Sequence, residues 1–557
     1  MTRTLTNQIN MKYFLSLILA IGFWCSNVLA QTTMVNIRSD VYDFLSRQAQ
    51  KGNIVFDDII RPVSRLKVTE LLDSLMVHQD KLLPIERKEV AFFQKEFGSN
   101  LKPKTWSNSD TPKFLKKDSN GRLRMLSVEK EKFKLNIDPE IEVGYLSSDT
   151  QSVRKISRGI NAWATWGKHW GLQFSYAEAT ESGSGLNPDK VFTPQPGIIL
   201  NTPITGKSFN YNQTKASLYY SWKKGVISIG QDNLLWGYGE NGRPVLSDKA
   251  PAFPYVRLSL DILKWLRFDY THAFLASNVI DSNQTYLNGN TVFGGEHIIY
   301  RPKFMATNTL IFKPMKGLDL AFGESVIYSE NLQFGYLMPF FYLKGYDQYS
   351  NGNRAQAGAN SQLFVQVSSR NQIKNTHLYA SLFVDEISLS NISNPQKSRN
   401  QVGYQLGASI TDLVIPYLTL QAEYTRINPF VYANLNPTQT YTSNYQVMGD
   451  WMGNNADRLL FSAKYSPIPR LRLMARYQFI QKGSAGTPEQ QYDMNNPQPP
   501  FLFGLLRKES EFLFKANYEL INNVYFMGSF GITSRQLAPS FSTQNFQSIS
   551  AGMAITL

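Results

Sequence analysis

One stretch of the chain, from residue 231 to residue 258, gathers side chains suited to binding a sugar. Aromatic rings can stack on pyranose faces, and carboxylate, amide and guanidinium groups can hydrogen-bond hydroxyls or pair with uronic acids. The candidate ligand-binding residues of this stretch are Trp236, Tyr238, Glu240, Asn241, Arg243, Asp248 and Arg257. The stretch is too rich in Gly and Pro to form one regular element, so the sequence predicts a long loop.

The same loop has a second interpretation. A loop that keeps large aromatic residues between two strand-like segments can also fold back on its own protein. In that case Trp236 and Phe253 form the packing core of a plug. Ligand contact and plugging are compatible, so the sequence leaves both open.

A second aromatic loop, over residues 333–353, adds Tyr346 and Tyr349 to the candidate contact residues. The alternative is that its rings form an interfacial aromatic girdle. Glu324, just before this loop, occupies one of the alternate positions that are apolar in the rest of its segment. A carboxylate at such a position would face lipid, which is energetically unfavourable. Either a bulge near Gly323 shifts the register, or Glu324 lies beyond the apolar band. Both interpretations make Glu324 a candidate contact at the rim.

Catalytic chemistry has little support in the sequence. The five histidines are scattered without metal-ligand spacing: His78, His169, His272, His297 and His377. No serine is evidently paired with His272, the one histidine with lipid-facing parity. We therefore expect no enzymatic activity, no cofactor and no metal site.

The N-terminus reads as a secretory signal peptide over residues 1–30, with Lys12 before an apolar run and Val28-Leu29-Ala30 as the cleavage pattern. The only cysteine, Cys25, lies inside it, and the bulky residues before Cys25 argue against a lipoprotein. The net charge is +14, and removal of Arg3 and Lys12 with the signal leaves +12. An exported chain with dispersed basic residues favours anionic lipid headgroups or an anionic polymer as partner, not nucleic acid.

Residues 31–100 have a helical pattern and predict a small bundle. Ser39 can cap a first helix that stops at Gly52, Ser64 precedes a second, and Pro84 begins a third. Residues 101–130 are polar and Lys-rich without a clear period, which indicates a linker.

From residue 131 to residue 557 the apolar period changes to two. In one such segment Leu418, Leu420, Ala422 and Tyr424 alternate with polar residues. The segments have the length of tilted membrane strands, and their connections alternate between short and long. The faces opposite the apolar ones carry charged and amide side chains, which suits a wet lumen. The sequence predicts an all-β transmembrane barrel of about eighteen antiparallel strands, with long extracellular loops and periplasmic helices.

The loop at residues 236–254 and two later motifs resemble the Wzi family of capsule assembly proteins. The motifs that carry the resemblance are Trp236-Gly237-Tyr238-Gly239, Leu246-Ser247-Asp248-Lys249-Ala250-Pro251, Gly323-Glu324-Ser325-Val326-Ile327-Tyr328 and Tyr336-Leu337-Met338-Pro339-Phe340. The resemblance implies an outer-membrane barrel that holds exported polysaccharide in a lectin-like way. Among such proteins, the chain is most similar to Bacteroidetes members, including gliding-motility proteins of the RemB type.

The functional expectation is a non-enzymatic outer-membrane barrel that binds or anchors surface polysaccharide, with a possible link to gliding. Two alternatives stay open. The first is a channel for solutes through a basic lumen lined by Arg267, Arg472 and Arg476. The second is a scaffold whose helices, within residues 35–100, dock a periplasmic export or motility machine.

Overall fold

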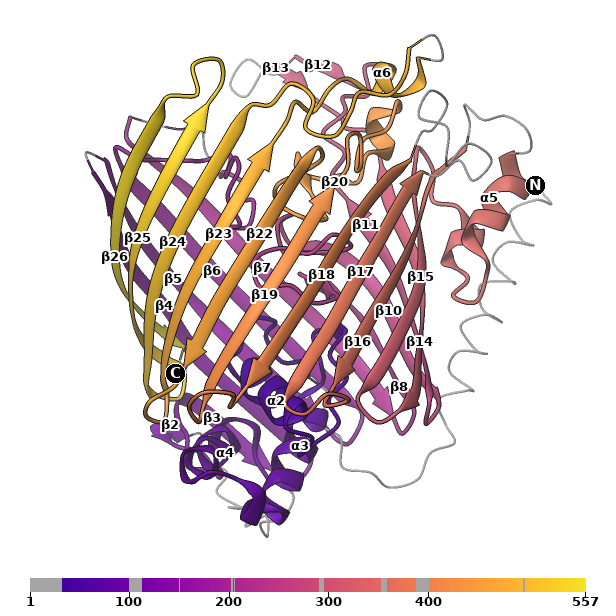
Figure 1. Cartoon of the computed structure of the whole chain (residues 1–557). Coiled ribbons are helices and arrows are strands. Elements are labelled where there is room, and N and C mark those ends of the chain that lie inside the picture. Colours follow the sequence, from indigo (N-terminus) through magenta and orange to yellow (C-terminus); the bar gives the residue numbers. More distant parts are fainter. Residues whose placement is uncertain are drawn as a thin grey trace, which may run out of the picture.

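The computed structural model describes residues 33–99, 113–149, 151–201, 204, 206–289, 295–351, 358–386, 400–493 and 496–556. The signal peptide predicted over residues 1–30 lies outside these ranges. Figure 1 shows a tall β-barrel with a group of helices at one end. None of the helices in the described ranges is both long enough and apolar enough to cross a membrane.

The barrel wall consists of eighteen antiparallel strands in the described part of the chain, which confirms the predicted fold class. The last strand pairs with the first, from Ser548 opposite Ser148 to Thr556 opposite Glu140, and this pairing closes the barrel. The wall strands are β4 (Phe133–Ser148), β5 (Gln151–Trp166), β6 (Trp170–Gly183), β7 (Ser208–Trp222), β8 (Gly225–Asp232), β10 (Phe253–Leu263), β11 (Leu266–Leu275), β14 (Lys303–Met315), β15 (Leu318–Ser329), β16 (Asn360–Arg370), β17 (Thr376–Glu386), β18 (Gln401–Thr411), β19 (Leu418–Ile427), β22 (Ala456–Tyr465), β23 (Leu471–Lys482), β24 (Arg507–Ile521), β25 (Val524–Leu537) and β26 (Thr543–Thr556).

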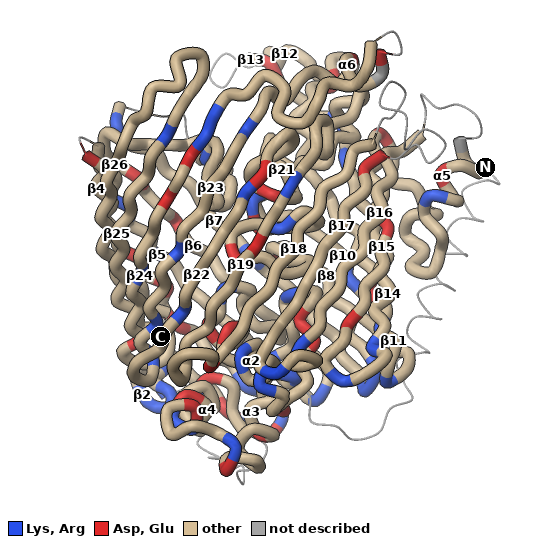
Figure 2. The backbone as a smooth tube through the Cα atoms, viewed as in Figure 1, with Lys and Arg blue, Asp and Glu red and all other residues tan. Residues whose placement is uncertain are grey.

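Side chains alternate between the two faces of the wall because successive residues of a strand point in opposite directions. On β22, Leu459 and Phe461 are exposed on the outer face, whereas Arg458 and Ser462 are buried on the inner face. Figure 2 shows charged residues at positions along the wall strands and a concentration of them around the helical end. The wall is therefore apolar outside and polar inside.

Three helices lie at the barrel end that carries the short turns: α2 (Val41–Gln50), α3 (Arg65–Val77) and α4 (Pro84–Phe97), with η1 (Gln79–Lys81) between the last two. Ser64 caps α3 by accepting a hydrogen bond from the backbone N–H of Lys67, and Pro84 occupies the first turn of α4. The predicted cap of the first helix differs. Asp40 holds the N-cap position of α2 without a side-chain hydrogen bond.

The predicted linker contains a β-hairpin. Its strands are β2 (Lys113–Lys117) and β3 (Leu123–Lys130), and β3 pairs with the start of β4, from Lys130 opposite Phe133 to Leu126 opposite Ile137. Residues 113–130 thus extend the wall at the helical end and do not form an irregular linker. Residues 101–112 of the predicted linker lie outside the described ranges.

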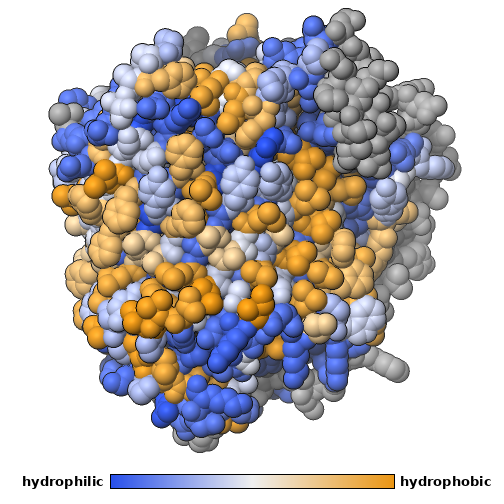
Figure 3. All heavy atoms as spheres, viewed as in Figure 1, coloured by the Kyte–Doolittle hydropathy of each residue, from blue (hydrophilic) through white to orange (hydrophobic). Residues whose placement is uncertain are grey.

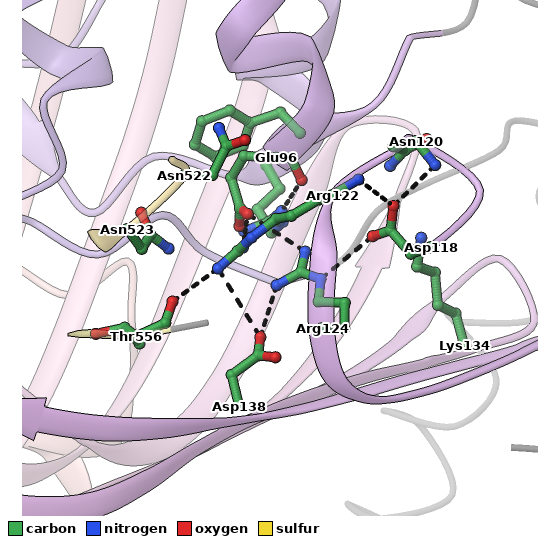
Figure 4. Close-up of polar contacts among 12 residues, drawn as sticks. Glu96, Asp118, Asn120, Arg122, Arg124, Lys134, Asp138, Asn522, Asn523 and Thr556 are labelled. Atoms are coloured by element: carbon green, nitrogen blue, oxygen red, sulfur yellow. Dashed lines mark hydrogen bonds and ion pairs between the residues drawn. The ribbon is translucent and has the colours of Figure 1, made fainter. Parts of the chain in front are cut away.

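A buried arginine joins this hairpin to the helices and to the wall (Figure 4). Arg124 is 1% exposed and forms ion pairs with Asp138 of β4 at 2.7 Å, with Asp118 at 3.2 Å and with Glu96 of α4 at 3.3 Å. Arg122 also contacts Glu96. Charged residues of the stretch that was predicted to be a linker therefore form the contacts that fix the hairpin.

Long segments between wall strands fold into the lumen. Residues 233–250 enter from the long-loop end and form β9 (Leu235–Trp236), which pairs with β1 (Ile60–Arg61) from the helical part of the chain. The segment after β19 enters beside it and contains η4 (Pro437–Gln439), β20 (Thr442–Ser443) and β21 (Gln446–Val447). Together they form an apolar core across the lumen, which includes Trp236, Leu246, Phe253, Tyr432, Tyr441 and Met448. We call this core the luminal plug.

Another loop packs on the outside of the barrel. After β15 the chain forms η2 (Phe334–Leu337) and α5 (Leu343–Asn351), and α5 lies against β14 and β15 outside the wall (Figure 1). The remaining elements, β12 (Tyr286–Asn288), β13 (Gly295–His297) and α6 (Pro488–Tyr492), lie at the long-loop end.

Candidate functional site

A cavity of about 670 Å³ lies in the lumen between α2 and the inserted segment 235–249. The inner faces of β17, β18, β19, β22, β23 and β24 form its wall. Five predicted ligand-binding residues line it: Tyr238, Glu240, Asn241, Arg243 and Asp248. We call it the luminal cavity.

Glycine lets the inserted segment pass close to the wall. Gly237 has a φ of +82°, and a Cβ there would stand 2.5 Å from the amide nitrogen of Gln366. Gly242 has a φ of +144°, and a Cβ there would stand 2.3 Å from a carboxylate oxygen of Asp450. Since only glycine tolerates both the conformation and the space, these residues fix the course of the segment past the cavity.

Tyr238 ties the segment to the helical part of the chain. Its hydroxyl donates to Asp58 at 2.9 Å, and its ring packs edge-on against His377 with centroids 4.7 Å apart. Asp58 also pairs with Arg61 at 2.6 Å and with Arg370 at 2.8 Å. Burial by itself would raise the pKa of Asp58, but the two guanidinium groups lower it further than burial raises it, so the carboxylate is charged.

Glu240 and Asn241 are held by the opposite wall. The carboxylate of Glu240 pairs with Lys464 at 2.9 Å, and Lys464 also pairs with Asp43 of α2 at 2.8 Å. The side-chain amide of Asn241 donates to Gln478 at 2.8 Å. The carboxylates of Glu240 and Asp43 are therefore both paired with one lysine of the wall, Lys464.

Two cations of the cavity have no carboxylate partner among the described residues. Arg243 donates through Nε to the backbone carbonyl of Gly237 at 3.0 Å and forms no ion pair, and burial lowers its pKa from the ordinary value. Lys515 on the inner face of β24 forms no ion pair either, and its side chain is exposed. Both can meet an incoming anion without first breaking a salt bridge.

Lys249 is a third such cation. Its ammonium group donates to the backbone carbonyls of Lys190 at 2.6 Å and Gln195 at 3.1 Å, and burial lowers its pKa to about 8. Asp248 beside it pairs instead with Arg38, at 2.6 Å.

The charge of the cavity lining is positive overall. Nine basic side chains and five acidic ones line it, together with the aromatic rings of Tyr238, Tyr379, Tyr417, Trp451 and Tyr465. Aromatic rings beside hydrogen-bonding groups are the composition expected of a saccharide site, and the cationic excess favours an anionic sugar. A cavity of this volume is of the size that takes a small molecule or a short piece of a polymer.

Two predicted residues of the first loop lie elsewhere. Trp236 is 1% exposed, and its ring stacks on Phe364 with centroids 5.7 Å apart, so it belongs to the luminal plug. Arg257 forms a buried two-point ion pair with Asp269 of β11, at 3.0 and 2.8 Å. Neither residue lines the cavity, and both hold the structure around it.

The other three predicted residues lie outside the barrel. The wall pairing continues without a shift through Gly323, so the predicted bulge is absent and Glu324 faces outward. Its carboxylate accepts hydrogen bonds from the first backbone N–H groups of α5. Tyr346 packs on Tyr336, whereas Tyr349 is 90% exposed. These residues are separate from the luminal cavity.

Sequence reasoning missed the cavity residues that come from other parts of the chain. Arg38 and Asp40 come from the start of the helical region, and Lys464 and Lys515 come from strands distant in sequence. The signal in the sequence was that alternate positions of the strands carry charged side chains. This pattern indicates a polar lumen, but it does not predict which charged side chains lie close together. Of the arginines proposed to line a channel, Arg472 and Arg476 line this cavity, while Arg267 pairs with Asp57 at 2.8 Å.

In the described ranges, no cluster of three or more His, Cys, Asp or Glu side chains could hold a metal ion. His272 and His377 are buried and hydrogen-bonded to Tyr328 and Ser368.

These features define a class of protein: a closed eighteen-stranded barrel with a plugged lumen, a small helical group at one end and a cationic internal cavity. The family model of the capsule assembly protein Wzi matches residues 101–519. The chain therefore belongs to the Wzi capsule assembly family. A search of the curated proteins gives no match.

A solved structure of low sequence identity shares the fold. Wzi of Escherichia coli, described as an outer membrane protein involved in group 1 capsule assembly and as a carbohydrate-binding β-barrel, superposes with a TM-score of 0.55 at 11% identity. The match covers 94% of this chain and 99% of that chain. OccK3 of Pseudomonas aeruginosa has a TM-score of 0.39 at 12% identity, covering 76% and 95% of the two chains.

Proposed function

We propose that this protein is a non-enzymatic outer-membrane barrel that holds an anionic surface polysaccharide during capsule assembly. The observation that carries the proposal is the luminal cavity, in which Arg243, Lys249 and Lys515 have no carboxylate partner among the residues that the structure describes and lie beside several aromatic rings. Membership of the capsule assembly family and the carbohydrate binding stated for the Escherichia coli relative support it.

The wall supports a membrane orientation. Apolar side chains gather over the middle of the visible wall, and hydrophilic ones lie toward the helical end (Figure 3). Short turns at one end and long loops at the other are typical of outer-membrane barrels, whose short turns face the periplasm. We therefore infer that the helices α2 to α4 are periplasmic, that the long loops are extracellular, and that the outer face contacts lipid.

In this proposal the cavity binds a charged sugar unit of the polymer. Arg243 and Lys515 pair with a carboxylate, and a ring such as that of Tyr379 or Tyr465 offers a face for stacking. The luminal plug keeps the cavity residues in place, so that binding needs little rearrangement.

Binding of the host's purified surface polysaccharide to the barrel in detergent tests the proposal. Arg243→Gln should weaken binding by about 1.5–3 kcal/mol, the value of a hydrogen bond to a charged group, which is roughly tenfold or more in Kd. Lys223→Gln, at an exposed turn, removes the same charge outside the cavity and should change nothing. If the wild type binds no polysaccharide above background, or if both variants weaken binding equally, the cavity is not the site.

The luminal plug argues against the channel alternative. Trp236, Tyr432 and Tyr441 pack together across the lumen and are each at most 3% exposed. We expect no steady conductance when the barrel is inserted in a planar bilayer, and stable anion-selective pores would favour a channel instead.

Cells lacking the protein test its role in assembly. If the barrel anchors polymer, the mutant should make polysaccharide and release it into the medium. The link to gliding motility is supported only by the sequence resemblance to RemB-type proteins. A strain that retains its polymer but no longer glides would move the assignment toward motility or toward the scaffold alternative.

A further inference from the structure

The outer wall carries a polar patch where lipid would be expected. Tyr270, Asn308 and Glu324 stand side by side on β11, β14 and β15, and all three face outward. Two residues away along the same strands, and on the same face, Leu310 and Phe322 are apolar and exposed, by 39% and 47% respectively. A carboxylate and an amide open to hydrocarbon would be strongly unfavourable.

Residues 330–351, which we call the outer cover, form a hydrogen bond with every member of this row. The carboxylate of Glu324 accepts hydrogen bonds from the N–H groups of Leu343 at 2.8 Å and Lys344 at 3.4 Å, at the positive end of α5. Asn308 donates to the carbonyl of Phe341 at 2.6 Å. Tyr270 donates to the carbonyl of Tyr336 at 2.7 Å.

Apolar packing fastens the rest of the cover. Val326 and Tyr328 face outward but are at most 1% exposed, because Tyr336 and Leu343 of the cover lie over them. Phe268 of β11 stacks on Phe340 with ring centroids 4.8 Å apart. The cover is thus part of the folded wall and not a loose extracellular loop.

The exposed side of the cover is largely aromatic. Its exposed large side chains have exposures from 37% to 90% and are Leu332, Phe334, Met338, Phe340, Phe341, Tyr342 and Tyr349. Phe340 stacks on Phe268, which is the neighbour of Leu310 and then Phe322 in the wall pairing, so this surface adjoins exposed apolar side chains of the wall. Phe, Leu and Met side chains are apolar enough to face hydrocarbon, and Tyr is enriched at membrane interfaces.

We propose that the outer cover lies within the outer leaflet and that its exposed aromatic side contacts lipid acyl chains. The cover shields the polar row from hydrocarbon and presents an apolar surface in its place. This inference rests on the membrane placement given under the proposed function, but it assigns a different surface and a different partner from the luminal cavity.

Spin labelling tests the inference, and the chain suits it because Cys25 is its only cysteine. In a full-length Cys25→Ser background, a nitroxide is attached at Phe340→Cys in phosphatidylcholine vesicles. Collisions with oxygen and with a water-soluble nickel chelate are measured by electron paramagnetic resonance. Phe322→Cys is the reference for the wall, and Leu287→Cys, on an 83% exposed residue of β12, is the reference for water.

The label at Phe340 should collide with oxygen several-fold more than with nickel, as the label at Phe322 should. If the label at Phe340 is accessible to nickel while the label at Phe322 faces lipid, the inference is overturned, but the membrane placement of the barrel is retained. Nickel access at both positions would instead refute the membrane placement itself. Low collision with both reagents at Phe340 would mean that protein, such as a second copy, covers this side, and would also overturn the inference.

A second measurement concerns the contacts that hold the cover. Asn308→Ala removes one hydrogen bond to the cover and Glu324→Ala removes both bonds to α5, so the label at Phe340 should become more mobile in each variant, and more so in the second. Heat-modifiable migration on gels reports whether each barrel has folded. An unchanged label in folded Glu324→Ala protein would show that the polar row does not hold the cover in place.

Discussion

Replacing Asp58 by asparagine should weaken the connection between the helical end and the luminal plug. The carboxylate is fully buried and takes part in ion pairs with Arg61 and Arg370 and in a hydrogen bond from Tyr238. Asparagine has the same shape, so the change removes the charge and leaves two buried guanidinium groups without their counter-ion. Breaking a buried pair in this way costs about 3–5 kcal/mol in the free energy of unfolding.

The pH dependence of this effect has a definite sign. The pKa of Asp58 is lowered in the folded protein, from an ordinary value of about 3.9 in the unfolded chain. Its stabilising contribution is therefore present in full above about pH 4 and is lost as the pH falls through the folded pKa. Wild type and Asp58→Asn should differ most near pH 7, and the difference should shrink in acid.

Urea unfolding in detergent micelles, followed by tryptophan fluorescence at pH 7 and pH 3, measures this difference. Asp43→Asn is the matched control, because Asp43 pairs with Lys464 at 2.8 Å but its side chain is 60% exposed. An exposed pair contributes at most about 1 kcal/mol. Equal unfolding midpoints of wild type and Asp58→Asn at pH 7, or a difference that is the same at pH 3, would refute the reasoning.

Three further outcomes follow from the structure. Trp236→Ala should cost about 3–5 kcal/mol in the free energy of unfolding, because it empties the middle of the luminal plug; a midpoint near that of wild type would mean that the plug does not stabilise the barrel. Binding of anionic polysaccharide should weaken between pH 7 and pH 9, because the Lys249 pKa of about 8 means that its charge is lost there, and Lys249→Arg should remove this decline in a titration. Arg257→Met should destabilise by about 3–5 kcal/mol by stranding Asp269, and adding Asp269→Leu should recover most of the loss if the pair itself is responsible.

The sequence predicts the wall well because each wall strand obeys a local rule. One face of a strand meets apolar surroundings and the other meets a polar lumen, which produces a two-residue period. On β22, for example, Leu459 and Phe461 are exposed outside and Arg458 and Ser462 are buried inside. The start of α3 is predicted equally well, since Ser64 acts through a neighbour only three residues away.

The hairpin at residues 113–130 could not be predicted by the same rule. Its arginines, Arg122 and Arg124, are buried by Glu96, Asp118 and Asp138, which come from three different elements. A buried ion-pair cluster has the composition of a solvated surface, so only the assembled structure distinguishes the two.

The candidate site divides along the same line. Composition identifies the 231–258 loop as rich in aromatic and charged side chains. It cannot predict which of these side chains form contacts within the protein and which are available to a ligand. Arg257 and Arg243 are chemically identical in the sequence. In the structure Arg257 pairs with Asp269 on the neighbouring strand, whereas Arg243 donates to a backbone carbonyl and has no carboxylate partner among the described residues. The availability of a charge depends on partners distant in sequence, and the fold determines which charges stay free for a ligand.

Glu324 extends this argument to the outer surface. Its parity identified it as a charge on the lipid side, and a bulge or a place beyond the apolar band were the local explanations. The structure gives a non-local one, since the backbone of α5, about twenty residues later, supplies the hydrogen bonds and the cover supplies the apolar face. A charge in an otherwise apolar register is thus a signal of a covering segment, and the aromatic residues that follow Glu324 indicate which segment that is.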